Sequence, residues 1–205
     1  MLEFDHFAVA GVSLEAAVDH VQTALGVSMI TGGKHALFGT HNALLGLEDG
    51  LYLEAISIDP AAADPGRARW FDLDRFDGPP RISNWICRTK DLRGALHDLP
   101  AEAGQPVDVA RGDLTWRMAV PADGQLPYHG AFPALIQWTG GRHPAARLPL
   151  SGCRLRRLII AHPDADALNV LLSGRLTDPR IRVESGAALA FHAEFDTPSG
   201  RRVLQ

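Results

Sequence analysis

Cysteines are scarce in this sequence, and long apolar runs are absent. The chain of 205 residues has two cysteines, Cys87 and Cys153, and no CxxC pair, which argues against a thiolate zinc site or a redox dithiol. Both cysteines lie in or beside apolar runs and are expected to be buried free thiols of a reducing compartment. No apolar stretch approaches the roughly 20 residues of a membrane span. The acidic Glu3 and Asp5 do not fit the basic start of a signal peptide, so a cytoplasmic location is expected.

The sequence also has no strong excess of positive or negative charge, and it has no nucleotide-binding motif. The formal net charge is −4, so no basic field extends over the sequence to attract nucleic acid. No P-loop, GxSxG or HExxH motif occurs, and no GxGxxG follows a strand, which argues against a nucleotide cofactor and against common hydrolase chemistry. Hydrophobic residues make up 46% of the chain, enough to bury a core. We expect a small-molecule partner rather than a nucleic acid or a membrane.

A strand, a helix and three further strands are predicted in the first 59 residues. "EFDHFAVAGV" alternates as a strand, and Ser13 caps a helix that Gly26 ends. The strand-like runs "HALFG", "NALLGL" and "LYLEAISI" follow, and "EDG" forms a turn between the last two. In the first strand, alternation places five residues on one face: Leu2, Phe4, His6, Ala8 and Ala10.

The same β-α-β-β-β order recurs along the chain. A Pro- and Gly-rich connector leads to a second copy, in which Asp91 caps a helix between "ISNWICRT" and the strands "PVDVAR", "LTWRMAVP" and "FPALIQWTG". A looser third copy has Asp164 before a helix, and its strand candidates are "CRLRRLIIA", "RIRVES", "ALAFHAEF" and "RRVLQ". The prediction is a domain over residues 1–150 with units at about 1–59 and 81–140, and a third unit over 151–205 packed on it.

Counting from the helix caps brings four polar residues into register. Seven residues before the first two caps lie His6 and Asn84, and aligning "YLEAI" with "LIQWT" pairs Glu54 with Gln137. These positions fall on the first and fourth strands of each unit. They are the first candidates for a functional site.

A unit with "DH" on its first strand and "YLE" on its fourth resembles the vicinal oxygen chelate (glyoxalase/bleomycin resistance/extradiol dioxygenase) superfamily. "GGKHALFGTHNALLGLEDGLYLEAI" and "LTWRMAVPADGQLPYHGAFPALIQWTGGRHP" resemble its glyoxalase-like domain family, over roughly residues 2–149. The resemblance implies an α+β fold in which repeated βαβββ units form curved mixed sheets around a cavity, with helices outside. In this superfamily, side chains inside the cavity can hold a divalent metal that chelates vicinal oxygens of a substrate, whereas some members bind small molecules without metal.

The resemblance implies that His6 and Glu54 occupy the positions of the metal ligands in the first unit. An imidazole and a carboxylate suit Zn, Mn, Fe or Ni; the alternative is a core histidine bonded to Glu54 or to backbone. Asn84 and Gln137 stand where active enzymes usually supply a further His or Glu, and amides are poor ligands for these metals. They are predicted to bind substrate, or else to be ordinary sheet residues.

Three further residues complete the predicted site. His143, in the His-Pro that matches the family, is the favoured third metal ligand, with His129 and His35 as alternatives. Arg117 is predicted to bind an anionic group of the substrate, although an outer-face position fits it equally well. Trp138 is predicted as a cavity wall, or otherwise as core.

The sequence leaves three functions open. The first is a metal-assisted lyase, isomerase or dioxygenase acting on a small oxygen-rich metabolite, with Glu54 as the base. The second is a metal-free protein that binds or sequesters a small molecule in the same fold. The third is assembly as a homodimer whose pocket is vestigial.

Overall fold

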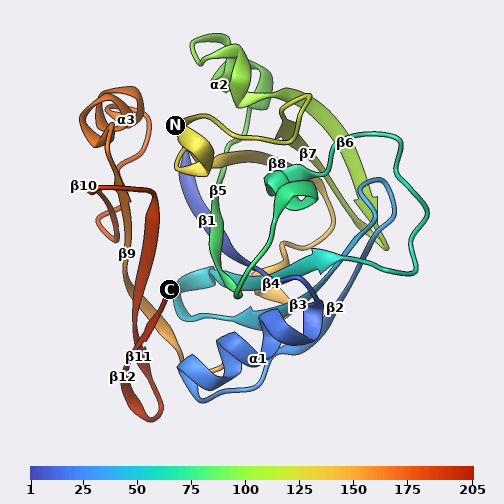
Figure 1. Cartoon of the computed structure of the whole chain (residues 1–205), viewed down its shortest axis with the longest axis vertical. Helices are drawn as coiled ribbons and strands as arrows, with labels where there is room; N and C mark the ends of the chain where they lie inside the picture. Colours follow the sequence, from blue (N-terminus) through green and yellow to red (C-terminus); the bar gives the residue numbers. More distant parts are fainter.

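Twelve strands form two sheets in the computed structural model, which describes residues 1–205. The strands of the larger sheet are β1 (Glu3–Ala10), β2 (Ile30–His35), β3 (Thr40–Gly46), β4 (Tyr52–Ile58), β5 (Arg81–Arg88), β6 (Gln105–Arg111), β7 (Leu114–Val120) and β8 (Ala134–Gly140). The smaller sheet contains β9 (Arg154–His162), β10 (Ile181–Ser185), β11 (Ala190–Thr197) and β12 (Gly200–Leu204). The larger sheet curls on itself, and the smaller sheet forms a layer beside it (Figure 1).

The helices begin where the sequence predicts them, and they lie outside the sheets. They are α1 (Leu14–Leu25), α2 (Leu92–His97) and α3 (Ala165–Leu172), with short 3-10 segments η1 (Glu48–Gly50), η2 (Trp70–Arg75), η3 (Ala101–Ala103), η4 (Tyr128–Gly130) and η5 (Pro144–Ala146). The Ser13 hydroxyl accepts from the Ala16 amide at 3.2 Å, and Gly26 ends α1 with φ 71°. None of the helices has the length and apolar composition needed to cross a membrane.

The larger sheet is built from two matching halves. Its order is β2-β3-β4-β1-β5-β8-β7-β6, so each half pairs its fourth strand with its first in parallel, and the antiparallel β1–β5 pair joins the halves. This arrangement of βαβββ units in a curved mixed sheet, with helices outside, confirms the predicted α+β fold class.

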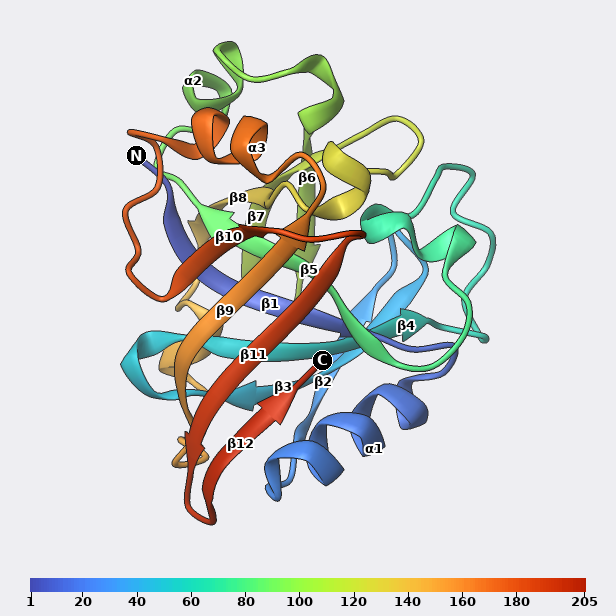
Figure 2. The same ribbon diagram turned by 60° about the vertical axis from the view of Figure 1, so that its left-hand side comes forward.

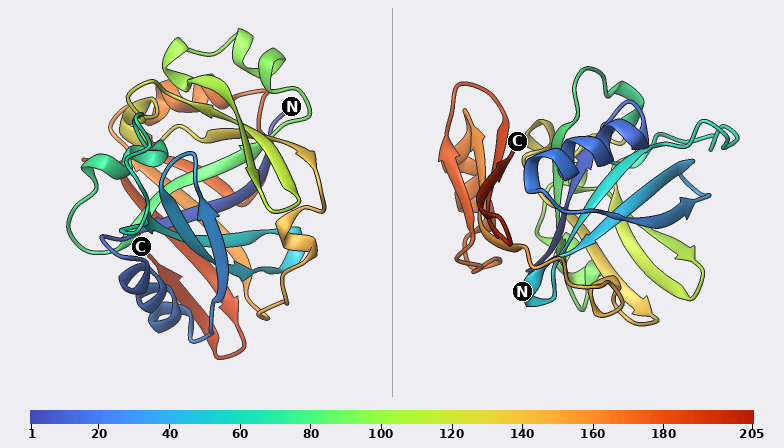
Figure 3. Two further views of the ribbon diagram at one scale, coloured as in Figure 1. Left: turned by 90° about the vertical axis from the view of Figure 1, so that its right-hand side faces the viewer. Right: turned by 90° about the horizontal axis from the view of Figure 1, so that it is seen from below.

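The C-terminal segment has the same order of elements but a different strand pairing. Its sheet runs β10-β9-β11-β12, so β9 pairs in parallel with β10, the second strand of the segment, and not with the fourth. This sheet crosses the strands of the larger sheet (Figure 2) and covers the convex side near β1 and β5 (Figure 3).

Two apolar clusters occupy the two faces of the larger sheet. On the convex face, Phe7 and Trp85 pack with Leu158 and Phe195 of the C-terminal sheet, and Cys87 and Cys153 lie in the same cluster as buried free thiols. On the concave face, the side chains of β7 and β8 pack with an aromatic group from the loops: Phe38, Trp70 and Phe71. The concave cluster leaves room for the polar cavity described below.

Two local predictions are wrong. The second strand is Ile30–His35, and "HALFG" contains the turn after it. In this turn, the Phe38 side chain is fully buried in the concave cluster. The first strand does not alternate throughout, because Leu2 and Phe4 join the convex cluster whereas Ala8 and Ala10 join the concave one. A register shift between Phe4 and His6 causes this exchange of faces.

Candidate functional site

The register shift in β1 brings two adjacent polar side chains into the protein interior. Phe4 pairs with Cys87 and His6 with Ile86, so Asp5 is an extra residue on β1. Asp5 is fully buried and His6 is 4% exposed. The bulge therefore allows a carboxylate and an imidazole that are neighbours in sequence to contact each other, which strict alternation would prevent.

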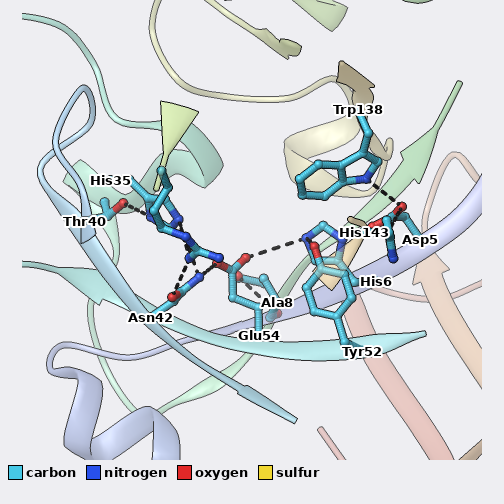
Figure 4. Close-up of polar contacts among 12 residues, drawn as sticks. Asp5, His6, Ala8, His35, Thr40, Asn42, Tyr52, Glu54, Trp138 and His143 are labelled. Carbon is cyan, nitrogen blue, oxygen red and sulfur yellow. Dashed lines mark hydrogen bonds and ion pairs between the residues drawn. The ribbon is translucent and has the colours of Figure 1, made fainter. Parts of the chain in front are cut away.

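Asp5 accepts hydrogen bonds from three side chains. His6 Nδ1 lies 2.6 Å from its Oδ1, while His143 Nε2 at 2.9 Å and Trp138 Nε1 at 3.1 Å reach its Oδ2 (Figure 4). The Tyr52 ring stacks on the His6 ring with centroids 4.2 Å apart. These contacts fix the His6 ring so that its Nε2 faces Glu54.

Glu54 connects His6 to a second group of polar residues. Its Oε2 lies 3.7 Å from His6 Nε2, and its Oε1 accepts from Asn42 Nδ2 at 2.5 Å. Arg111 Nη1 donates to Asn42 Oδ1 at 3.0 Å and to His35 Nε2 at 3.2 Å. The result is a buried polar chain that runs from Asp5 through His6, Glu54 and Asn42 to Arg111.

This chain borders a cavity of about 30 Å³ on the concave face. Its polar lining comes from both halves of the sheet, since Arg111 belongs to the second half and the other polar residues to the first. Three tryptophans complete the wall: Trp70, Trp116 and Trp138. The space holds about two water molecules, so a larger ligand requires movement of the wall.

Hydrogen bonds between the buried ionisable groups oppose the effect of burial on their pKa values. Burial alone would raise the pKa of Asp5, but hydrogen bonds from His143 and His6 hold it well below its ordinary range. Burial would likewise raise the pKa of Glu54 and lower that of His6, yet their mutual contact, with Asp5 beside His6, lowers the first and raises the second. These opposite shifts favour an imidazolium at His6 between two carboxylates.

His35 behaves differently because it has no carboxylate partner. Its Nδ1 donates to Thr40 Oγ1 at 3.0 Å, and its Nε2 accepts from Arg111. Burial lowers its pKa from 6.5 to about 4, so the ring is neutral in the folded protein.

His35→Gln is expected to flatten the pH dependence of stability between pH 7 and pH 4.5. In this range the unfolded chain protonates His35 and the folded protein does not, so native stability falls as the pH falls. The native protein should lose about 2 to 3 kcal/mol more than the variant over this range. Urea unfolding at a series of pH values measures the slope.

The other shifted groups of the site act mostly outside this pH range. His6 has a raised pKa, so its contribution is lost only as the pH rises above 6.5, while Asp5 and Glu54 have lowered values and lose theirs only below about 4.5. His20→Gln, at a half-buried position on α1, serves as the matched control and should retain the native slope. An unchanged slope in His35→Gln would contradict the assignment of a neutral buried ring.

The donors at the cavity do not fit a divalent metal ion. His6 Nε2 and Glu54 are donors of the right kind, but no group of three His, Cys, Asp or Glu side chains is placed to hold a metal. The lone pair of His35 Nε2 is used by Arg111, and a guanidinium beside the site opposes a second cation. The predicted third ligand, His143, bonds to Asp5 and does not line the cavity.

The structure brings His6, Glu54 and Trp138 to one cavity and places the other predicted substrate-binding residues elsewhere. Alternation on β7 and β8 turns Trp116 and Trp138 inward, so the neighbouring Arg117 and Gln137 face outward. Arg117 donates to Asp108 at 2.8 Å, and Gln137 accepts from the Leu92 amide at the start of α2. Asn84 lines a separate cleft beyond Phe71.

Three residues of the site were not predicted: Asp5, Asn42 and Arg111. The "DH" pair predicts a role for its histidine only, although a carboxylate next to a buried imidazole is a common orienting partner. Asn42 follows from alternation, since it lies beside Glu54 on the inner face of β3. Nothing in the local sequence around Arg111 indicates that it reaches residues of the first unit.

Comparisons with known proteins are consistent with this architecture. A family model described as a glyoxalase-like domain matches residues 4–175. A hypothetical protein from Staphylococcus aureus aligns with a TM-score of 0.64 at 15% identity, covering 92% of this chain and 88% of that chain. Methylmalonyl-CoA epimerase from Mycobacterium tuberculosis aligns with a TM-score of 0.43 at 18% identity, covering 70% of this chain and 91% of that chain. No curated protein matches the sequence.

Proposed function

We propose a function for the cavity of this chain, which belongs to the glyoxalase-like domain family. The cavity binds a small oxygen-rich anion and moves a proton from one atom of that anion to another. The reaction class is an isomerase or lyase that works by acid-base chemistry. The observation that supports this proposal is an ionised, buried Glu54 that shares one cavity with the guanidinium of Arg111. Buried charges are costly, and their convergence in a cavity favours a functional role.

Glu54 is the proposed base. Asn42 donates to Oε1 at 2.5 Å, whereas the nearest partner of Oε2 is His6 Nε2 at 3.7 Å, so Oε2 is the oxygen proposed to accept a proton. A C–H bond next to a carbonyl group would break, its proton would pass to Oε2, and its electron pair would form an enolate. Where that carbon also carries a hydroxyl group, the hydroxyl proton would move to the enolate oxygen. The carboxyl group would then return its proton to the former carbonyl carbon, which completes an isomerisation.

Arg111 is the proposed anion-binding residue. Its Nη1 is occupied by Asn42 and His35, and its Nη2 makes no hydrogen bond within the protein. A guanidinium held in this way can donate to a substrate carboxylate or to the enolate oxygen that forms during proton transfer. The low dielectric of a cavity walled by tryptophans strengthens that contact.

The metal-assisted form of this function would use His6 and Glu54 as ligands. Because the donor set does not fit a metal, the proposal contains no metal step, and a dioxygenase is not supported. Metal analysis of protein purified without chelator provides the check, since a stoichiometric metal that His6→Ala removes would overturn this choice.

Binding without turnover is the second candidate. The three tryptophans of the wall favour it, because indole rings can pack around a ligand but supply no acid or base for a reaction. Entry would involve η2, in which Phe71 and Asp72 have φ values of 60° and 55°, a conformation that costs energy for residues other than glycine. Movement of this segment would open the cavity and relieve that strain.

Arg111→Met is expected to weaken binding of pyruvate, the probe anion, by about tenfold or more. The variant loses a charge-assisted hydrogen bond to the carboxylate. Tryptophan fluorescence measures binding, because three tryptophans line the cavity. Arg117→Met removes an arginine that bonds to Asp108 outside the cavity and is the matched control. Equal dissociation constants for the two variants would contradict the proposed anion site.

Exchange of the pyruvate methyl hydrogens in D₂O separates the two candidates. Proton transfer predicts exchange faster than the buffer rate, followed by ¹H NMR. Saturable fluorescence change without exchange would favour the binding protein.

A further inference from the structure

A second hollow lies between the open end of the larger sheet and the C-terminal sheet. Its volume is about 470 Å³, within the range of small-molecule sites. Its walls come from η2, β5, η4 and β11. Phe71 lines both this cleft and the inner cavity, so the two hollows share a wall.

Asn84 is an unusual residue of this cleft. It is 3% exposed, and its Oδ1 has no hydrogen-bond partner. Other amides on the same sheet are satisfied: Asn42 uses both ends of its amide, and so does Gln137. A buried acceptor without a partner is rare, because burial removes the water that would satisfy it. Asn84 lines the cleft, so its unpaired amide oxygen is an acceptor that a donor from a ligand could satisfy.

The surroundings of Asn84 favour a neutral, flat ligand. Three phenyl rings line the cleft, from Phe71, Phe76 and Phe191. The cations of the cleft already have partners. Arg75 forms an ion pair with Asp72 at 2.5 Å. Arg81 donates to the backbone oxygens of residues 77 and 79 and lies over the Phe76 ring at 4.2 Å.

We infer that this cleft binds a neutral planar molecule with an N–H donor of the carboxamide or lactam type. The donor would bond to Asn84 Oδ1, and the ring would pack against the phenyl side chains. Gly130, with φ 98°, lies next to the amide: a Cβ there would be 3.8 Å from Asn84 Nδ2. Gly130 thus lies within van der Waals range of the Asn84 amide, on its Nδ2 side. This site uses none of Asp5, His6 or Glu54, so it goes beyond the proposed proton transfer.

Benzamide and N,N-dimethylbenzamide form a matched pair of probes for this site. Both have the same aromatic acyl group, but only benzamide carries an N–H donor. Titration of the full-length ¹⁵N-labelled protein, followed by NMR, should show saturable shifts of the Asn84 side-chain amide with benzamide. The dimethyl compound should bind at least about tenfold more weakly, the effect of one lost hydrogen bond to a buried acceptor.

Variants separate this cleft from the inner cavity. Asn84→Leu should bind benzamide about tenfold more weakly than the native protein does, and Glu54→Gln should keep the native affinity. No saturable shift with benzamide, or equal affinities of the native protein for the two probes, would overturn the inference. The probe comparison uses the native protein alone and stays decisive even where Asn84→Leu does not fold.

Discussion

Asp5→Ala is expected to lower the free energy of unfolding by about 3 to 5 kcal/mol, the usual cost of removing one partner from a buried ion pair. Asp5 is fully buried and accepts hydrogen bonds from His6 at 2.6 Å, His143 at 2.9 Å and Trp138 at 3.1 Å. Without the carboxylate, the two imidazoles and the indole lose their common acceptor at a fully buried position. Equilibrium urea unfolding at pH 7 measures the loss.

The chain contains a closely matched control for this prediction. His97 and Asp98 are also adjacent in sequence, with His97 Nδ1 2.8 Å from Asp98 Oδ1, but both side chains are exposed. Because water solvates both groups of this pair, Asp98→Ala should leave the unfolding midpoint almost unchanged. Similar losses in the two variants would show that burial adds nothing to the Asp5 contacts.

The helices and most strands follow from local signals in the sequence. Ser13 and Asp91 accept from backbone amides in the first turns of α1 and α2, as their positions before apolar helical patterns predict. The two βαβββ units were predicted from the order of these signals. Local sequence is enough to predict these helix starts, because each capping side chain bonds to a backbone amide only three residues further along the chain.

The register of single residues was harder to predict, because it depends on which neighbour a strand pairs with. Aligning Glu54 with Gln137 is off by one residue: Trp138 faces the cavity, whereas Gln137 caps α2. A shift of one residue moves a side chain to the opposite face of a sheet. The bulge at Asp5 has the same effect within β1, and no turn or glycine marks it in the sequence.

The assembly of the site depends on contacts that sequence spacing does not contain. Arg111 reaches Asn42 from the far half of the sheet, 69 residues along the chain, and His143 reaches Asp5 over 138 residues. Closure of the curled sheet brings both contacts about, and that closure depends on the packing of the whole concave core. Of the candidate residues that line the cavity, His6 and Glu54 lie in the first unit and Trp138 lies in the second.

Glu54→Gln is expected to slow the exchange of pyruvate methyl hydrogens by about 100- to 10,000-fold, the usual effect of losing a general base. Glutamine has nearly the same shape, and its carbonyl oxygen can still accept from Asn42, so the cavity should keep its form. Contact with His6 holds the pKa of Glu54 below 4.5, so the native base stays ionised from pH 5 to pH 8. Protonation of Glu54 should therefore not lower the exchange rate between pH 5 and pH 8.

Glu3→Gln provides the control, because Glu3 lies on the same strand as His6 but is exposed and pairs with Arg88 at 2.9 Å. Its exchange rate should match that of the native protein. Should Glu54→Gln bind pyruvate and exchange its hydrogens at the native rate, Glu54 would not be the base. Should neither protein exchange pyruvate while both bind it, the cavity would be a binding site, and the buried charges around Glu54 would serve recognition of the anion.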